Sequence, residues 1–103
     1  MTKDNTNNSY GLRKEVLDSI RSIAAADDVG CLKLFGSRAR GDYRERSDID
    51  LAVYGGKVEK FWLDVEEDVP TLLKFDVVDM NKPISHELID SIEKEGIIIY
   101  EKI

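Results

Sequence analysis

Apolar residues along this chain fall alternately at helical and at strand spacing, and this alternation constrains the fold more than any other feature. From Leu12 onward they recur every three or four residues, which predicts a helix over about residues 11–26. A short apolar run at 31–35 is then ended by Gly36, as a buried strand would be. Residues 49–53 alternate apolar with small or acidic side chains, which again predicts a strand.

The alternation continues to the C-terminus. Helical spacing returns over 58–69 and is closed by Pro70, and a further strand is expected over 72–79. A helix over about 84–95 and a β-branched strand over 97–100 complete the pattern. The fold class is therefore α/β or α+β, with helices packed on a small sheet.

Length and charge limit the number of domains and the kinds of partner. A chain of 103 residues can bury one small core, so we expect residues 1–10 to be a disordered polar tail and 11–103 a single domain. The net charge of −6 argues against general nucleic-acid binding. Apolar runs are too short to cross a membrane, and a single cysteine, Cys31, precludes an internal disulfide. These features predict a cytoplasmic protein with no membrane partner.

Three acidic residues stand where strand geometry would bring their carboxylates together. Asp48 and Asp50 open a predicted strand and, being two residues apart, project from the same face. Asp76 lies between Phe75 and Val77, so it points away from these apolar neighbours onto a polar face. Carboxylates this close are tolerated if they are exposed, if one is protonated, or if a cation lies between them. Mg²⁺ is such a cation, since it prefers carboxylate and phosphate oxygens.

Each of these acidic residues also has an ordinary explanation. Carboxylates on the solvent face of an edge strand are common, so Asp48 and Asp50 alone do not indicate a metal site. Asp79 is an alternative third carboxylate. Strand parity, however, places Asp79 on the face of Phe75, so Asp76 is preferred.

A Gly-Ser pair follows the predicted strand at 31–35. Gly36 and Ser37 could form a common turn, or a phosphate cradle in which backbone amides and the hydroxyl donate hydrogen bonds. Arg38 and Arg40 would add positive charge beside it, because guanidinium groups bind phosphate oxygens in bidentate fashion. The same arginines could equally be plain surface.

Together these motifs resemble a known family. The Gly-Ser pair at 36–37, ten intervening residues and the Asp-Ile-Asp triplet at 48–50 resemble the signature of the DNA polymerase β-like nucleotidyltransferase superfamily, with Asp76 at its third acidic position. The run at 34–41 and the short chain resemble the minimal nucleotidyltransferases (MNT) in particular. Many of these resemble the antitoxin half of HEPN/MNT toxin–antitoxin pairs.

The resemblance implies a fold, a reaction and a partner. The fold would be nucleotidyltransferase-like, with a small mixed β-sheet. The reaction would be a Mg²⁺-dependent transfer of a nucleoside monophosphate, AMP from ATP, to a hydroxyl group of a HEPN ribonuclease toxin. By resemblance, the catalytic residues and ligands of two Mg²⁺ ions would be Asp48, Asp50 and Asp76. The nucleotide would be bound by Gly36, Ser37, Arg38 and Arg40.

Two other functions remain open at this point. The chain could be a non-catalytic antitoxin that neutralises its toxin by contact alone and keeps the nucleotide pocket as an inherited feature. It could also be a small nucleotide-binding regulator, or the catalytic subunit of an antibiotic-modifying enzyme. The presence of all three motif carboxylates favours an enzyme.

The remaining distinctive residues have structural explanations. His86, the single histidine, is expected at the surface or in a helix cap. Cys31 is expected in the core, as is Trp62 beside Phe61, although a large aromatic side chain could also serve a partner interface. Tyr43 could stack on a base or simply be exposed.

Overall fold

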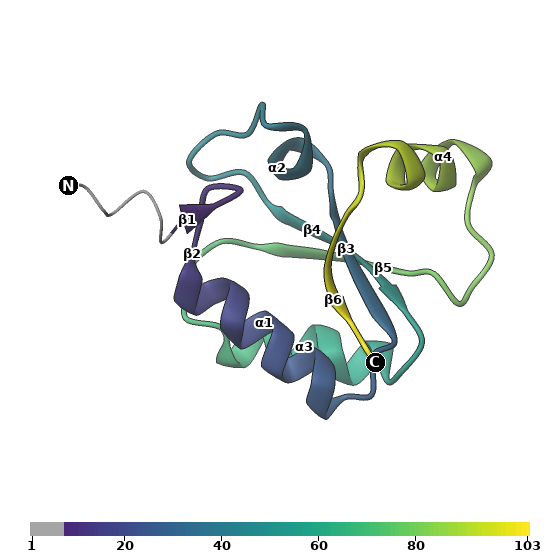
Figure 1. Ribbon diagram of the computed structural model, residues 1–103, viewed down its shortest axis with the longest axis horizontal. Helices are drawn as coiled ribbons and strands as arrows, with labels where there is room; N and C mark the ends of the chain where they lie inside the picture. The colour runs from purple at the N-terminus through teal and green to yellow at the C-terminus, as the bar shows by residue number, and fades with distance from the viewer. Residues whose placement is uncertain (1–7) are drawn as a thin grey trace.

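A computed structural model describes residues 8–103 of the chain as a mixed α and β fold (Figure 1). The expected fold class is confirmed. The elements in chain order are β1 (Asn8–Ser9), β2 (Leu12–Arg13), α1 (Lys14–Ala26), β3 (Cys31–Phe35), α2 (Ser37–Arg40), β4 (Ile49–Tyr54), α3 (Val58–Asp68), β5 (Phe75–Asp79), α4 (His86–Glu95) and β6 (Ile97–Glu101).

Four of the strands form one mixed sheet in the order β5-β4-β3-β6. The β4 and β5 strands are parallel, whereas β3 is antiparallel to both β4 and β6. The register pairs Asp50 with Phe35 on one side and with Asp76 on the other. Strands β1 and β2 form a separate two-stranded hairpin.

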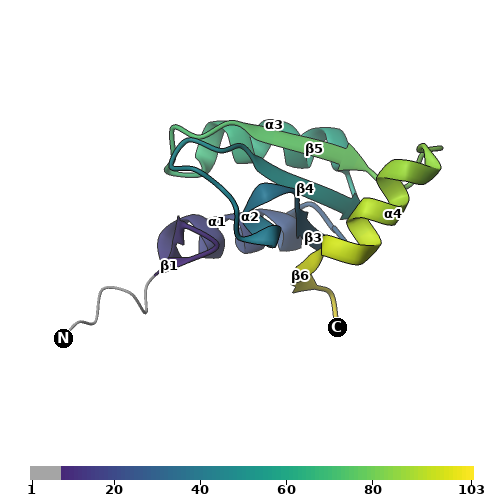
Figure 2. The same cartoon turned by 90° about the horizontal axis from the view of Figure 1, so that it is seen from above.

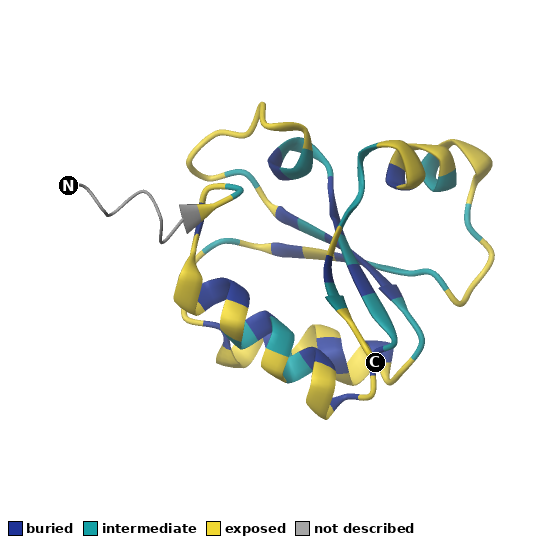
Figure 3. Cartoon of the chain, viewed as in Figure 1, coloured by how far each residue is buried: buried dark blue, intermediate teal, exposed yellow. Residues whose placement is uncertain are grey.

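Helices α1 and α3 pack side by side against one face of the sheet (Figure 1). The period-two alternation supplies that face, because every second residue of β3, β4 and β5 joins the core. Along α1 the buried residues recur at helical spacing, and Figure 3 shows them as buried bands between exposed ones. The strand residues of this core are Leu32, Leu34, Ile49, Leu51, Val53, Phe75, Val77 and Ile99.

The opposite face of the sheet is covered by α4, which lies away from α1 and α3 (Figure 2). Ile92 of α4 packs there with Phe35 and Ala52, and Val78 borders this smaller cluster. Asp50 belongs to the same face but stands two residues nearer to the start of β4 than Ala52. The acidic positions therefore lie at the margin of the face that α4 covers.

A buried carboxylate joins α1 to α3. Asp27, directly after α1, is 1% exposed, and the Nζ atom of Lys60 on α3 lies 3.1 Å from its Oδ1. Lys60 also contacts Asp64 one turn later, at 2.7 Å. Burial raises the pKa of the Asp27 carboxyl, while the Lys60 ammonium acts in the opposite direction.

The structure departs from the expected boundaries at two places. Residues 1–7 of the expected tail lie outside the described residues. Among the described ones, Asn8–Ser9 pair with Leu12–Arg13, and the helix expected from about residue 11 begins at Lys14. The strand expected over 72–79 begins only at Phe75, because the turns after Pro70 keep the preceding residues out of the sheet.

Three residues with expected structural roles differ in how well their burial agrees with the prediction. Trp62 was expected in the core but is 38% exposed, because the stripe that α3 buries runs through Phe61 and Val65 instead. Cys31 is only partly buried. His86 is exposed, and the hydroxyl of Ser85 caps α4 by accepting a hydrogen bond from a backbone amide. Across residues 8–103, none of the helices is both long and apolar enough to cross a membrane.

Candidate functional site

The carboxylates of Asp50 and Asp76 lie on neighbouring parallel strands at directly paired positions. Phe75 and Val77 are buried on the opposite face, whereas Asp76 is exposed, as the alternation predicts. Asp50 is half-buried, and Asp48, directly before β4, is exposed. The fold thus gathers the two strand carboxylates at one edge of the sheet, with Asp48 beside them.

The turn at Gly36 fits closely against Asp50. Gly36 has a φ of 76°, a conformation that favours glycine, and a Cβ atom at this position would clash with the Asp50 carboxylate. The Gly36 carbonyl accepts hydrogen bonds from the amides of Ala39 and Arg40, which starts α2. Only glycine therefore lets β3 turn into α2 at this distance from the acidic site, and Ser37 follows at its edge.

Like charges dominate the electrostatics of the site. Burial, followed by the charges of Asp76 and Asp48, raises the pKa of the Asp50 carboxyl to about 6. Arg40 and Arg38 oppose this rise without cancelling it. A group that is costly to ionise in the free protein is one that a bound cation would stabilise.

Arg40 remains at the surface near this site. Its Nη1 atom lies 3.1 Å from Glu95 at the end of α4, and its Nε atom lies 3.3 Å from Asp42. Its side chain is 44% exposed. Because both ion pairs are exposed, they are weak enough to be exchanged for a phosphate.

Arg38, in contrast to Arg40, is buried. It is 2% exposed, and its guanidinium donates hydrogen bonds to the carbonyls of Ser47, Glu45 and Tyr10 at 2.9–3.3 Å. It also packs 5.1 Å from the centre of the Tyr43 ring. These contacts occupy the group that was expected to bind phosphate. We therefore propose that Arg38 acts as a positioning residue, which holds the segment leading to the acidic triplet.

Sequence reasoning could not separate the two arginines. Residues two apart on a helix point to nearly opposite sides, so Arg38 and Arg40 cannot both face the same ligand. Which of them faces inward depends on the path of residues 42–47, and nothing in the spacing fixes that path. Tyr43, for which base stacking was considered, is 37% exposed and covers Arg38.

The donor set fits a cation only in part. Within residues 8–103, no three His, Cys, Asp or Glu side chains are grouped closely enough to hold a metal ion. Asp50 and Asp76 nevertheless present paired carboxylates, and Mg²⁺ is commonly bound by one or two carboxylates while substrate phosphates and water complete its shell. The arrangement therefore suits a cation that arrives with a polyphosphate.

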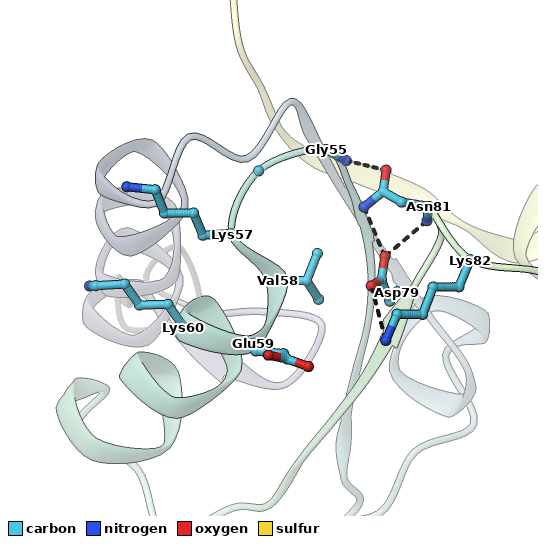
Figure 4. Close-up of a pocket in the computed structure, with 9 residues that line it drawn as sticks. Gly55, Lys57, Val58, Glu59, Lys60, Asp79, Asn81 and Lys82 are labelled. Atoms are coloured by element: carbon cyan, nitrogen blue, oxygen red, sulfur yellow. Dashed lines mark hydrogen bonds and ion pairs between the residues drawn. The ribbon is translucent and has the colours of Figure 1, made fainter.

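Asp79, the alternative third carboxylate, lies at the other end of β5 and serves a turn. Its Oδ1 accepts hydrogen bonds from the backbone amide and the side-chain amide of Asn81, at 2.9 and 2.8 Å (Figure 4). The Asn81 side chain in turn accepts a hydrogen bond from the Gly55 amide. These residues line a hollow of about 710 Å³ at the end of the sheet opposite to Asp76.

Comparison with known proteins finds one family that matches the sequence and several solved structures with a similar fold. Residues 18–103 match the family described as "Polymerase beta, Nucleotidyltransferase". No curated protein matches the chain. Among solved structures, a "toxin-antitoxin with AMP-PNP" has a TM-score of 0.68 at 19% identity, covering 84% of this chain and 73% of that one.

Two further structures share the fold. A "putative minimal nucleotidyltransferase" has a TM-score of 0.63 at 24% identity, and covers 89% of this chain and 97% of that one. A "putative nucleotidyltransferase from Sulfolobus solfataricus" has a TM-score of 0.55 at 23% identity, with coverage of 86% and 79%. At sequence identities of 19–24%, these structural similarities show a shared fold and nothing more specific.

Proposed function

The chain belongs to the polymerase β nucleotidyltransferase family, and from this premise we propose that it transfers AMP from ATP to a hydroxyl group of a partner protein. The observation that carries the proposal is the pairing of Asp50 with Asp76, together with the Gly36 turn that only glycine can make against Asp50. A polyphosphate-binding turn and paired carboxylates at one sheet edge are what such a transfer requires.

The residues divide the chemistry among them. The turn at Gly36 and Ser37 would hold the β and γ phosphates with backbone amides and the Ser37 hydroxyl, and Arg40 would add positive charge. The paired carboxylates of Asp50 and Asp76 would hold Mg²⁺ together with the phosphates of ATP, and Asp48 before them would supply a further carboxylate. When bound, Mg²⁺ neutralises the charge of the triphosphate and of the carboxylates.

The step itself is an in-line displacement at the α-phosphorus. The acceptor hydroxyl oxygen forms a bond to this phosphorus, and the bond from the phosphorus to the oxygen that bridges to the β-phosphate breaks. AMP becomes attached to the acceptor, and pyrophosphate leaves. Asp76, which is exposed, would accept the proton of the hydroxyl.

We further propose that the partner is a toxin and that the chain is its antitoxin in the cytoplasm. One structure with this fold is that of a toxin–antitoxin with AMP-PNP, an ATP analogue, which supports both the nucleotide and the kind of partner. The HEPN type of the toxin rests on the sequence resemblance.

A transfer assay with two matched variants tests the catalytic site. Purified protein is incubated with Mg²⁺, ATP labelled at the α-phosphate and the product of a neighbouring HEPN gene, and label on the partner is measured. Asp76→Ala should lower the transfer rate by about a hundredfold or more, since a cation ligand and proton acceptor are lost. Asp79→Ala should change it by less than about threefold, because Asp79 serves the turn at Asn81. Equal losses of transfer rate in the two variants would mean that Asp76 has been assigned to the catalytic site wrongly.

A further inference from the structure

A shallow groove leads along the segment between α3 and β5 to Asp48. Its first part, of about 600 Å³, lies against β2 and α1, and its second part, of about 630 Å³, lies against the loop before β4. Both parts are lined by Leu72 and Leu73, so they lie side by side along this segment. The lining of the second part consists of Glu45, Arg46, Asp48, Leu72, Leu73 and Lys74.

We propose that this groove binds an extended, acidic and apolar segment of the partner protein and so presents the acceptor hydroxyl at Asp48. The inference rests on the proposed function, because it names the surface through which the acceptor reaches that site. The occupant is a protein segment with an apolar side chain over Leu72 and acidic side chains opposite Arg46 and Lys74.

The apolar part of the argument is the exposure of Leu72. This side chain is 103% exposed, as free as in an extended peptide, although it stands between the two hollows. Val69 and Pro70 continue the apolar lining towards β2. A partner side chain placed here would remove apolar surface from water on both molecules, which favours association.

Charge gives the second part of the argument. Arg13, Arg46 and Lys74 line the groove against Glu45 and Asp48, on a chain whose net charge is −6. The three basic side chains outnumber the two acidic ones, so the lining is slightly positive on an acidic protein, which suits an acidic segment.

The lining also favours a protein over an RNA strand. Single-stranded nucleic acids are bound by aromatic side chains on which bases stack, together with basic residues that follow the backbone. The side chains that line these two hollows are aliphatic and charged, and none is aromatic. Aliphatic contacts at intervals of a few residues suit an extended peptide better.

Fluorescence anisotropy tests the groove without requiring turnover. The probes are short fluorescent peptides with one tyrosine, rich in Leu and Glu, in Leu and Lys, or in Ser and Glu, and a single-stranded RNA of similar length, each titrated with the protein in Mg²⁺. The Leu–Glu peptide should bind most tightly. Leu72→Asp and Lys74→Glu should each weaken its binding by about tenfold or more.

Leu63→Asp is the matched control. Leu63 is 54% exposed on α3 and does not line the groove, so this variant should bind the peptide within about twofold of the unmodified protein. Melting curves of all variants should coincide within a few degrees, because both leucines are exposed. Tighter binding of the RNA than of any peptide, equal weakening by Leu63→Asp and Leu72→Asp, or no peptide binding would each overturn the proposal.

The groove and the proposed function can fail separately. If the peptide binds with this pattern but the partner never acquires AMP, the groove stands and the transfer reaction is wrong. If the Leu72→Asp variant transfers AMP from ATP to the partner at the same rate as the unmodified protein, the reaction stands and the groove is not the acceptor surface.

Discussion

At the scale of single residues, Asp50 lies in an environment that raises its pKa and lowers the stability of the folded protein at neutral pH. Its pKa in the folded protein is about 6, above its ordinary value of 3.8. Between these pH values the folded protein binds more protons at Asp50 than the unfolded chain does. Stability contributed by this group therefore falls as the pH rises from about 4 to 6, and the loss persists above pH 6.

Asp50→Asn should accordingly stabilise the metal-free protein at pH 7.5. Because Asp50 is only half-buried and solvent screens its charge, we expect a gain on the order of 1 kcal/mol in the free energy of unfolding. The gain should shrink towards zero below about pH 4, where Asp50 is protonated in both states. Urea unfolding in EDTA at the two pH values measures this. Destabilisation by Asp50→Asn at pH 7.5 would contradict the cause assigned to the pKa.

Arg38 differs from Asp50 in that its contacts are structural. Arg38→Met should lower the free energy of unfolding by about 2–4 kcal/mol, because the carbonyls of Ser47, Glu45 and Tyr10 lose their charged donor. Arg40→Met is the control and should cost less than about 1 kcal/mol, since its ion pairs are exposed. Urea unfolding compares the two. A larger loss of stability for Arg40→Met than for Arg38→Met would contradict the structural role and favour Arg38 as a nucleotide-binding residue.

These two residues show how far sequence reasoning reaches at this scale. The orientation of Asp76 followed from parity, because its neighbours Phe75 and Val77 could only be buried together. The contacts of Arg38 did not, since its acceptors are backbone carbonyls up to 28 residues away. Backbone carbonyls are present at every position, so a sequence pattern carries no record of which ones are used.

At the scale of elements, spacing predicted the order and type of the main helices and strands. The hairpin of β1 and β2 was missed because each strand has two residues, too short for any period to show. Leu72 and Leu73 extended an apolar run and were assigned to a strand, but hydrogen bonds within the turn at Thr71 hold them outside the sheet. As a result Leu72 is fully exposed and stands in the proposed acceptor groove, whereas Leu73 packs partly against the core.

An exposed lysine on α3, Lys60, pairs with the buried carboxylate that follows α1. Lys60→Ala should lower the free energy of unfolding at neutral pH, because it removes the charged partner of the buried Asp27 carboxyl. Lys57→Ala, at an exposed position just before α3, should change stability by less than about 0.5 kcal/mol. Thermal unfolding monitored by circular dichroism compares the pair. Equal effects would mean that Asp27 does not need Lys60.

At the scale of the whole molecule, the site uses one edge of a small sheet. Helices α1 and α3 cover one face and α4 covers part of the other, which leaves the starts of β4 and β5 accessible (Figure 2). The family and the fold could be inferred from the motifs, because the Gly-Ser pair and the acidic residues lie at fixed places in that sheet. Whether the carboxylates bind a cation could not be inferred from the motifs, because a polyphosphate would also have to supply ligands to that cation.

The most direct test of transfer to a partner protein is the intact mass of that partner. A candidate HEPN toxin is incubated with Mg²⁺, ATP and a substoichiometric amount of this protein, which is then removed before mass and ribonuclease activity are measured. We predict that the HEPN protein gains the mass of one or more AMP groups and stays inactive, and that Asp48→Asn produces neither effect. An unmodified HEPN protein, inhibited equally by Asp48→Asn and by the unmodified chain, would contradict the account and indicate an antitoxin that acts by contact alone.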